Sequence, residues 1–166
     1  MKRFRFVRAP FWAALCWAAV FLGERAAQAA ESSWVEVQLV WGTDADHSPN
    51  SKYKPIDEAT AAGLRKSFKW KYYYEVNRQP VNVSASGTPM HVKMSDHCTL
   101  DVQYLKDGHL EVMLFGDGKL VSTHREKMST GWKTVLAGDA KNDTAWLVII
   151  KKVEPPGNKV VGPGAR

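Results

Sequence analysis

The feature that most constrains the fold is a two-residue alternation of apolar and polar side chains, repeated in one short segment after another. In residues 34–41, Val35, Val37 and Leu39 share one side, and polar residues fall between them. A strand sends successive side chains to opposite faces, so this period predicts a strand with one buried face. Further strands are expected in residues 71–83, 90–95, 100–104, 109–115, 119–125, 132–136 and 145–153.

Turn signals separate these segments. Asp107-Gly108 and Asp117-Gly118 are typical of two-residue hairpin turns. Pro80 cannot donate a ladder hydrogen bond, so it places the later part of its strand on an edge or at a bulge. About eight short strands with such turns predict a mainly β fold, an antiparallel β-sandwich or a partly open barrel.

One short helix is expected over residues 57–68. Asp57 is a good N-cap, because its carboxylate accepts hydrogen bonds from the free amides of the first turn. Ala61, Leu64 and Phe68 fall on one helical face, although Gly63 disfavours the helix. This face would cover one end or one open face of the sheets.

Two-residue turns would fix the register of the central strands. The expected pairs are Val102 with Met113, Leu100 with Phe115, Phe115 with Leu120, and Leu114 with Val121. Both faces of this sheet would then be largely apolar, whereas a simple sandwich has a polar outer face. We therefore expect the helix, the tail or a partner chain to cover the second face.

The same register predicts a cross-strand row of Tyr104, Glu111 and His124. A carboxylate beside an imidazole raises the histidine pKa and fixes its tautomer, which is typical of acid–base catalysis. A stabilising polar row at the rim of a sheet explains the same residues, and the row contains no nucleophile.

The first 29 residues predict a cleavable signal peptide. Lys2, Arg3 and other basic residues precede an apolar stretch over residues 9–23, and Ala27 and Ala29 are the small residues before a cut. The stretch is shorter than a membrane span requires, so no transmembrane segment is expected after cleavage. An uncleaved anchor is the alternative. The predicted organisation is a leader (1–29), one β-rich domain (30–153) and a Pro- and Gly-rich disordered tail (154–166).

Removing the leader changes the charge and the cysteine count. The chain has 23 basic and 17 acidic residues, of which the leader holds five and one, so the domain and tail retain 18 and 16. This small excess does not favour nucleic acid as a partner. Cys98 is then the single cysteine, for which we expect burial in the core, with an intermolecular disulfide as the alternative.

Candidate metal ligands lie in three places, and none matches a strong metal-binding motif. Asp139, Asn142 and Asp143 form an oxygen-rich loop that suits calcium, although turn chemistry explains the same residues. The other two groups are Asp44, Asp46 and His47, and His91, His97 and Cys98. The sequence shows no cofactor-binding motif, so no cofactor is expected.

Aromatic residues suggest a binding patch. Trp70, Tyr72 and Tyr74 would alternate with Tyr73 along a strand, so one set would face the core. We expect mainly core packing. Trp70, Tyr72 and Tyr74 are the set expected on the exposed side, and they are the best binding candidates.

Three segments resemble a family of small exported bacterial proteins to which no activity is assigned. They are LVWGTD (39–44), FKWKYY (68–73) and KNDTAW (141–146). The resemblance covers about residues 34–150. It implies export and a compact domain, and it implies no functional residue.

These observations favour a non-catalytic binding or interaction module in the periplasm or outside the cell, with an envelope protein or a glycan as partner. The alternatives are a small extracytoplasmic hydrolase that uses the row Tyr104, Glu111 and His124, and a domain stabilised by calcium or another metal.

The leader predicts the N-terminus of the exported protein. We expect signal peptidase to cut after Ala29, because small residues at 27 and 29 fit its specificity. The intact mass of the protein recovered outside the cytoplasm should correspond to residues 30–166. Recovery of the full-length chain from the cytoplasm would contradict this expectation.

Overall fold

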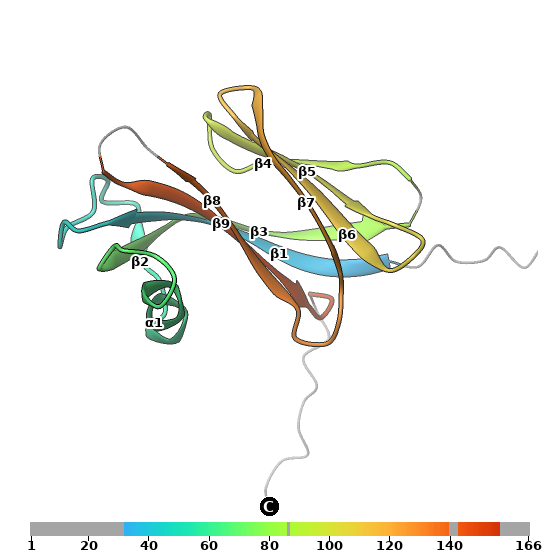
Figure 1. Ribbon diagram of the computed structural model, residues 1–166, viewed down its shortest axis with the longest axis horizontal. Coiled ribbons are helices and arrows are strands. Elements are labelled where there is room, and N and C mark those ends of the chain that lie inside the picture. The colour runs from blue at the N-terminus through green and yellow to red at the C-terminus, as the bar shows by residue number, and fades with distance from the viewer. Residues whose placement is uncertain (1–31, 86, 140–142, 157–166) are drawn as a thin grey trace, which may run out of the picture.

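The fold is a β-sandwich of two antiparallel sheets with one short helix (Figure 1). The computed structural model describes residues 32–85, 87–139 and 143–156. The five-stranded sheet has the order β2-β3-β1-β9-β8, and the four-stranded sheet has the order β4-β5-β6-β7. This confirms the predicted sandwich and excludes a closed barrel for the described residues. The predicted leader (1–29) and most of the predicted tail (157–166) lie outside them.

The element bounds agree closely with the alternating segments. The elements are β1 (Ser32–Thr43), β2 (Lys54–Pro55), α1 (Glu58–Arg65), β3 (Tyr72–Ser84), β4 (Met90–Lys93), β5 (Cys98–Tyr104), β6 (His109–Gly116), β7 (Lys119–Lys127), β8 (Lys133–Asp139) and β9 (Ala145–Val153). The two-residue β2 is the strand that the sequence does not signal. Within the described residues, no helix has the length and apolar character needed to cross a membrane.

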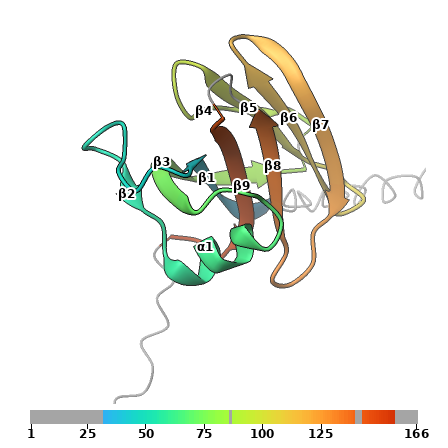
Figure 2. The same ribbon diagram turned by 60° about the vertical axis from the view of Figure 1, so that its left-hand side comes forward.

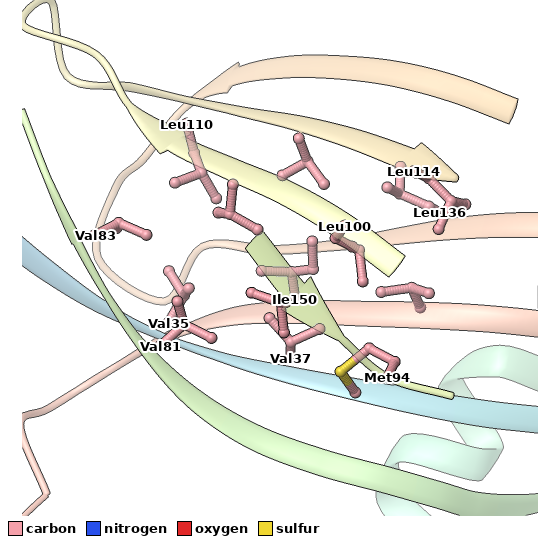
Figure 3. Close-up of a cluster of buried hydrophobic side chains, with 14 of the residues drawn as sticks. Val35, Val37, Val81, Val83, Met94, Leu100, Leu110, Leu114, Leu136 and Ile150 are labelled. Atoms are coloured by element: carbon pink, nitrogen blue, oxygen red, sulfur yellow. The ribbon is translucent and has the colours of Figure 1, made fainter. Parts of the chain in front are cut away.

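The main core fills the space between the sheets. Val35, Val37 and Leu39 of β1 are fully buried there, which confirms the alternation predicted for this strand. Figure 3 shows Val35 and Val37 beneath Leu100 and Leu110 of the opposite sheet. These side chains form one continuous hydrophobic layer, the main source of stability in a sandwich.

A second core lies on the outer face of the five-stranded sheet. Leu147 and Ile149 of β9 are buried there with Leu64 of α1, Trp70 and Tyr73. Figures 1 and 2 show α1 on the side of this sheet away from the four-stranded sheet. The helix therefore covers one open face, as predicted.

The helix begins as the sequence indicates. Asp57 is its N-cap, and the Asp57 carboxylate accepts a hydrogen bond from the Thr60 amide at 2.8 Å. The helix ends at Arg65, three residues earlier than expected. The amides of Lys66 and Ser67 bond to carbonyls three residues back, so the chain leaves the helix through a tighter turn.

The register predicted for β5 and β6 is wrong by one residue. Their connection is a three-residue turn with Gly108 at φ 81°, closed by a hydrogen bond from the Leu105 amide to the His109 carbonyl. This is the turn type in which a left-handed glycine follows a type I turn. The observed pairs are Val102 with Val112, Leu100 with Leu114, and Tyr104 with Leu110.

A shift of one residue moves every side chain to the other face. The inner face of this sheet carries Leu100, Val102, Leu110, Val112 and Leu114, which are all buried. The central part of the outer face carries polar residues such as Asp101, Gln103 and Glu111. The prediction of two apolar faces is therefore wrong, and no cover over the outer face is needed.

The hairpin of β6 and β7 has the predicted two-residue turn, and a β-bulge follows that turn in β7. Asp117 and Gly118 have φ values of 50° and 73°, and Phe115 pairs with Leu120 as predicted. Val121 is then an extra residue, so Leu114 pairs with Ser122 and not with Val121.

Side chains join the two sheets along both long sides. On one side, the Asn77 and Gln79 amides of β3 donate to the carbonyls of Met94 (2.9 Å) and Lys93 (2.8 Å) beside β4. On the other, His124 Nε2 lies 3.3 Å from Thr134 Oγ1. Pro80 lies on the free edge of β3, as predicted, because β2 pairs only with Tyr74 and Glu75.

Close packing at Gly42 gives a test of the second core. A Cβ atom at Gly42 would lie 3.2 Å from the Tyr73 ring and 3.3 Å from Leu147, so Gly42→Ala should destabilise the fold by about 1 to 3 kcal/mol. Gly138→Ala is the control in the same sheet, since a Cβ there meets nothing within 4 Å. Chemical denaturation measures the free energy of unfolding of both variants. Equal free energies of unfolding for Gly42→Ala and Gly138→Ala would contradict the close packing around Gly42.

Candidate functional site: a cleft at one end of the sandwich

A cleft of about 720 Å³ lies between the sheets at one end of the sandwich. β5 and β9 begin at this end, and β6 and β8 finish there. Figure 1 shows the two sheets diverging towards the end at which β6 turns into β7. The volume falls within the range typical of small-molecule sites.

Most of the lining is apolar and comes from both sheets. The five-stranded sheet contributes Gly138, Trp146 and Val148, with Tyr53 just before β2. The four-stranded sheet contributes Cys98, Leu114, Phe115, Gly116 and Val121.

A row of cross-strand neighbours ends in this cleft. Tyr74, Trp41, Trp146 and Gly138 are successive partners on β3, β1, β9 and β8. The first two rings are buried, with centroids 6.2 Å apart, whereas Trp146 is 39% exposed. Gly138 has no side chain to cover the indole, so the row finishes in open space.

The remaining lining is polar and is contributed by two turns. Ser95, Asp96 and His97 lie between β4 and β5, and Asp117 lies at the tip of the β6–β7 hairpin. His97 Nδ1 is 2.6 Å from Asp117 Oδ1, and the Asp117 amide donates to the His97 carbonyl at 3.0 Å. These contacts hold the two turns together. Lys93, 2.8 Å from the Asp96 carboxylate, lowers the pKa of Asp96.

Cys98 lines the cleft as a protonated thiol. Its side chain is partly buried and packs against the main core, in line with the expected burial. Burial raises the pKa of the Cys98 thiol to about 11. A thiol with such a pKa is a poor nucleophile at neutral pH, because the thiolate is the reactive form.

The predicted row of Tyr104, Glu111 and His124 is not formed. Tyr104 is buried opposite Leu110, and His124 pairs with Val112. Glu111 pairs with Gln103 and Arg125 on the opposite face from His124. The three-residue turn and the bulge at Val121 each shift the register by one residue, which separates the three side chains.

Two of the three aromatic binding candidates are interior residues. Trp70 is buried, and its indole donates to the Asp143 carbonyl at 2.9 Å. Tyr74 is buried against Trp41, although it was expected on the exposed side. Tyr72 is exposed. Both faces of β3 are covered here, so Tyr73 and Tyr74 are both interior residues.

The calcium loop is described only in part. The Asp143 carboxylate pairs with Lys69. Asn142 and the side chain of Asp139 lie outside the described residues.

The other metal candidates do not form one group. His91 faces outward and lies 2.7 Å from Asp101, whereas His97 and Cys98 line the cleft. The Asp44 carboxylate accepts from the Lys71 amide, and the neighbouring Asp46 pairs with His47. Among the residues that the structure describes, no three His, Cys, Asp or Glu side chains are grouped to hold a metal ion.

The sequence analysis did not identify Tyr53, Gly138 or Trp146 as site residues. Alternation along β9 does place Trp146 on the same face as Val148 and Ile150. Its exposure depends on Gly138 opposite it and on the divergence of the sheets. Only the tertiary structure supplies these two facts.

The high pKa of Cys98 predicts slow thiol chemistry. At pH 8, iodoacetamide should alkylate Cys98 in the folded protein about a hundredfold more slowly than in denaturant, because the folded pKa lies about two units above the ordinary 9.0. The rate should rise with pH until the thiol ionises near pH 11. A Cys16→Ser background removes the other cysteine. Equal rates in the folded and unfolded chains would contradict the burial of this thiol.

Comparison of the chain with protein-family models, with curated proteins and with solved structures finds no match. The candidate site therefore depends on the geometry and chemistry of this cleft alone.

Proposed function

We propose that this protein is an exported, non-catalytic binding module of the cell envelope, with the end cleft as its ligand site. The observation that carries the proposal is the exposed indole of Trp146 inside a cleft between two otherwise close-packed sheets. Exposed aromatic side chains in concave, mostly apolar sites are typical of ligand binding.

The distribution of exposed apolar residues supports this site. The large hydrophobic residues exposed in the described part of the chain are Tyr72, Met90, Leu120, Val121 and Trp146. Val121 and Trp146 line the cleft, and Leu120 precedes Val121 in β7. Exposed apolar residues that lie together in a cleft indicate a binding site, whereas single exposed apolar residues scattered over a surface need no functional explanation.

The chemistry of the lining favours binding over catalysis. The Cys98 thiol stays protonated at neutral pH. His97 and Asp117 are paired with each other on the exposed rim, where solvent weakens their interaction. The hydrolase alternative depended on a row of three side chains that the observed register separates.

A neutral solvatochromic dye tests the cleft without knowledge of the natural ligand. Nile red should bind the mature protein saturably, with blue-shifted emission, because the cleft is largely apolar. Gly138→Phe should abolish this binding, since residue 138 faces the cleft and a Cβ there meets no atom within 4 Å.

The matched control is Ala137→Phe, which adds the same ring one residue earlier, on the outer face of β8 beside Leu147. Dye binding should persist in this variant, and circular dichroism should show that both variants fold. Absence of saturable dye binding to the wild-type protein, or equal binding by both variants, would refute the proposed site.

A further inference from the structure

We infer that the cleft takes a ligand bearing an organic cation, an ammonium or guanidinium group on an apolar body; this inference rests on the proposed binding function. The cation would lie between the exposed indole of Trp146 and the carboxylate of Asp117, which both line the cleft. The apolar body would contact the hydrophobic part of the lining.

The charges of the lining carry the first part of the argument. Residues 30–166 hold 18 basic and 16 acidic residues, yet the cleft is lined by two aspartates and by no lysine or arginine. Asp96 is already paired with Lys93, which leaves Asp117 as the principal negative charge. Carboxylates of one sign around a cleft raise the local concentration of ligands of the opposite sign.

Asp117 also has a free oxygen for a ligand. His97 Nδ1 contacts Oδ1 of this carboxylate, and among the described residues no contact to Oδ2 is found. The Asp117 side chain is largely exposed at the hairpin tip. An ammonium or guanidinium N–H can therefore donate to it without displacing an existing partner.

The indole of Trp146 is the second feature that favours a cationic ligand. A cation is attracted to the face of an aromatic ring, and tryptophan binds cations most strongly. Trp146 lines the cleft and is 39% exposed, and its strand partner Gly138 carries no side chain.

The same fold already contains this combination of groups elsewhere. Lys69 Nζ lies 5.5 Å from the centroid of the Trp70 ring and also pairs with the Asp143 carboxylate. There the cation is an internal side chain. In the cleft, Trp146 and Asp117 provide a ring and a carboxylate, and the lining provides no lysine or arginine.

Matched probes test the role of charge. We expect phenethylammonium to bind about tenfold more tightly than 2-phenylethanol in isothermal titration calorimetry at low salt. The difference should shrink at high salt, because salt screens exposed charges. A second pair of probes distinguishes a cation carried by a peptide from a free amine. The affinity of N-acetyl-Phe-Arg-amide is compared with that of its analogue in which neutral citrulline replaces arginine. Preference for the arginine peptide indicates a peptide ligand, and preference for phenethylammonium alone indicates a free amine.

Asp117→Asn tests the carboxylate itself. Asparagine tolerates the left-handed backbone at this position, so the turn should be kept. Binding of the preferred cation should weaken about three- to fivefold, as for loss of an exposed ion pair. Asp101→Asn is the matched control, because Asp101 also pairs with a histidine but lies on the outer face. It should leave binding unchanged.

The outcomes distinguish the two proposals. If the neutral probes bind as tightly as the cations and Gly138→Phe abolishes both, the cleft is a binding site and the cation preference is wrong. If Nile red binds but the cations do not, the preference is again wrong. Equal effects of Asp117→Asn and Asp101→Asn would also overturn it. If neither the dye nor any probe binds, the proposed function fails as well.

Discussion

Burial of β1 and β9 on both faces is the constraint on which the rest of the structure depends. Their inner side chains form the floor of the main core, and Val40, Leu147 and Ile149 on the outer face require a second cover. Helix α1 and the segment that carries Trp70 supply that cover. The almost continuous apolar run of β9, from Trp146 to Ile150, follows from this two-sided burial.

The joining of the sheets determines where an opening can exist. Side-chain hydrogen bonds from Asn77 and Gln79 join one long side, and the contact between His124 and Thr134 joins the other. Space for a ligand is therefore left at an end. At that end Gly138 carries no side chain and a Cβ there would meet nothing within 4 Å, so the cleft stays open between the two layers.

Much of the fold could be predicted because strand alternation and helix capping are local signals. Val35, Val37 and Leu39 of β1 and the N-cap at Asp57 behave as their sequence patterns indicate. The pairing of β5 with β6 could not be fixed in this way. Asp107-Gly108 is compatible with a two- or a three-residue turn, and one additional turn residue inverts every face.

The candidate site was the less predictable part for the same reason. Its members come from five strands and three connections, and no pair of them forms a recognisable motif. The row of Tyr104, Glu111 and His124 had a local rationale but depended on two assumed turn lengths. Trp146 had no local signal that distinguished it from a core tryptophan. The prediction of this row therefore failed because an error of one residue in register decides which side chains become neighbours.

The extra residue at Val121 has a consequence for the behaviour of the protein at high concentration. β7 is an edge strand, and its unpaired backbone groups could template a further strand from another molecule. The irregularity at Val121 twists and bends the edge, and Lys119 and Lys127 place positive charges at its two ends. A second copy would meet a distorted, mutually repelling partner there, which protects this edge against sheet-to-sheet aggregation.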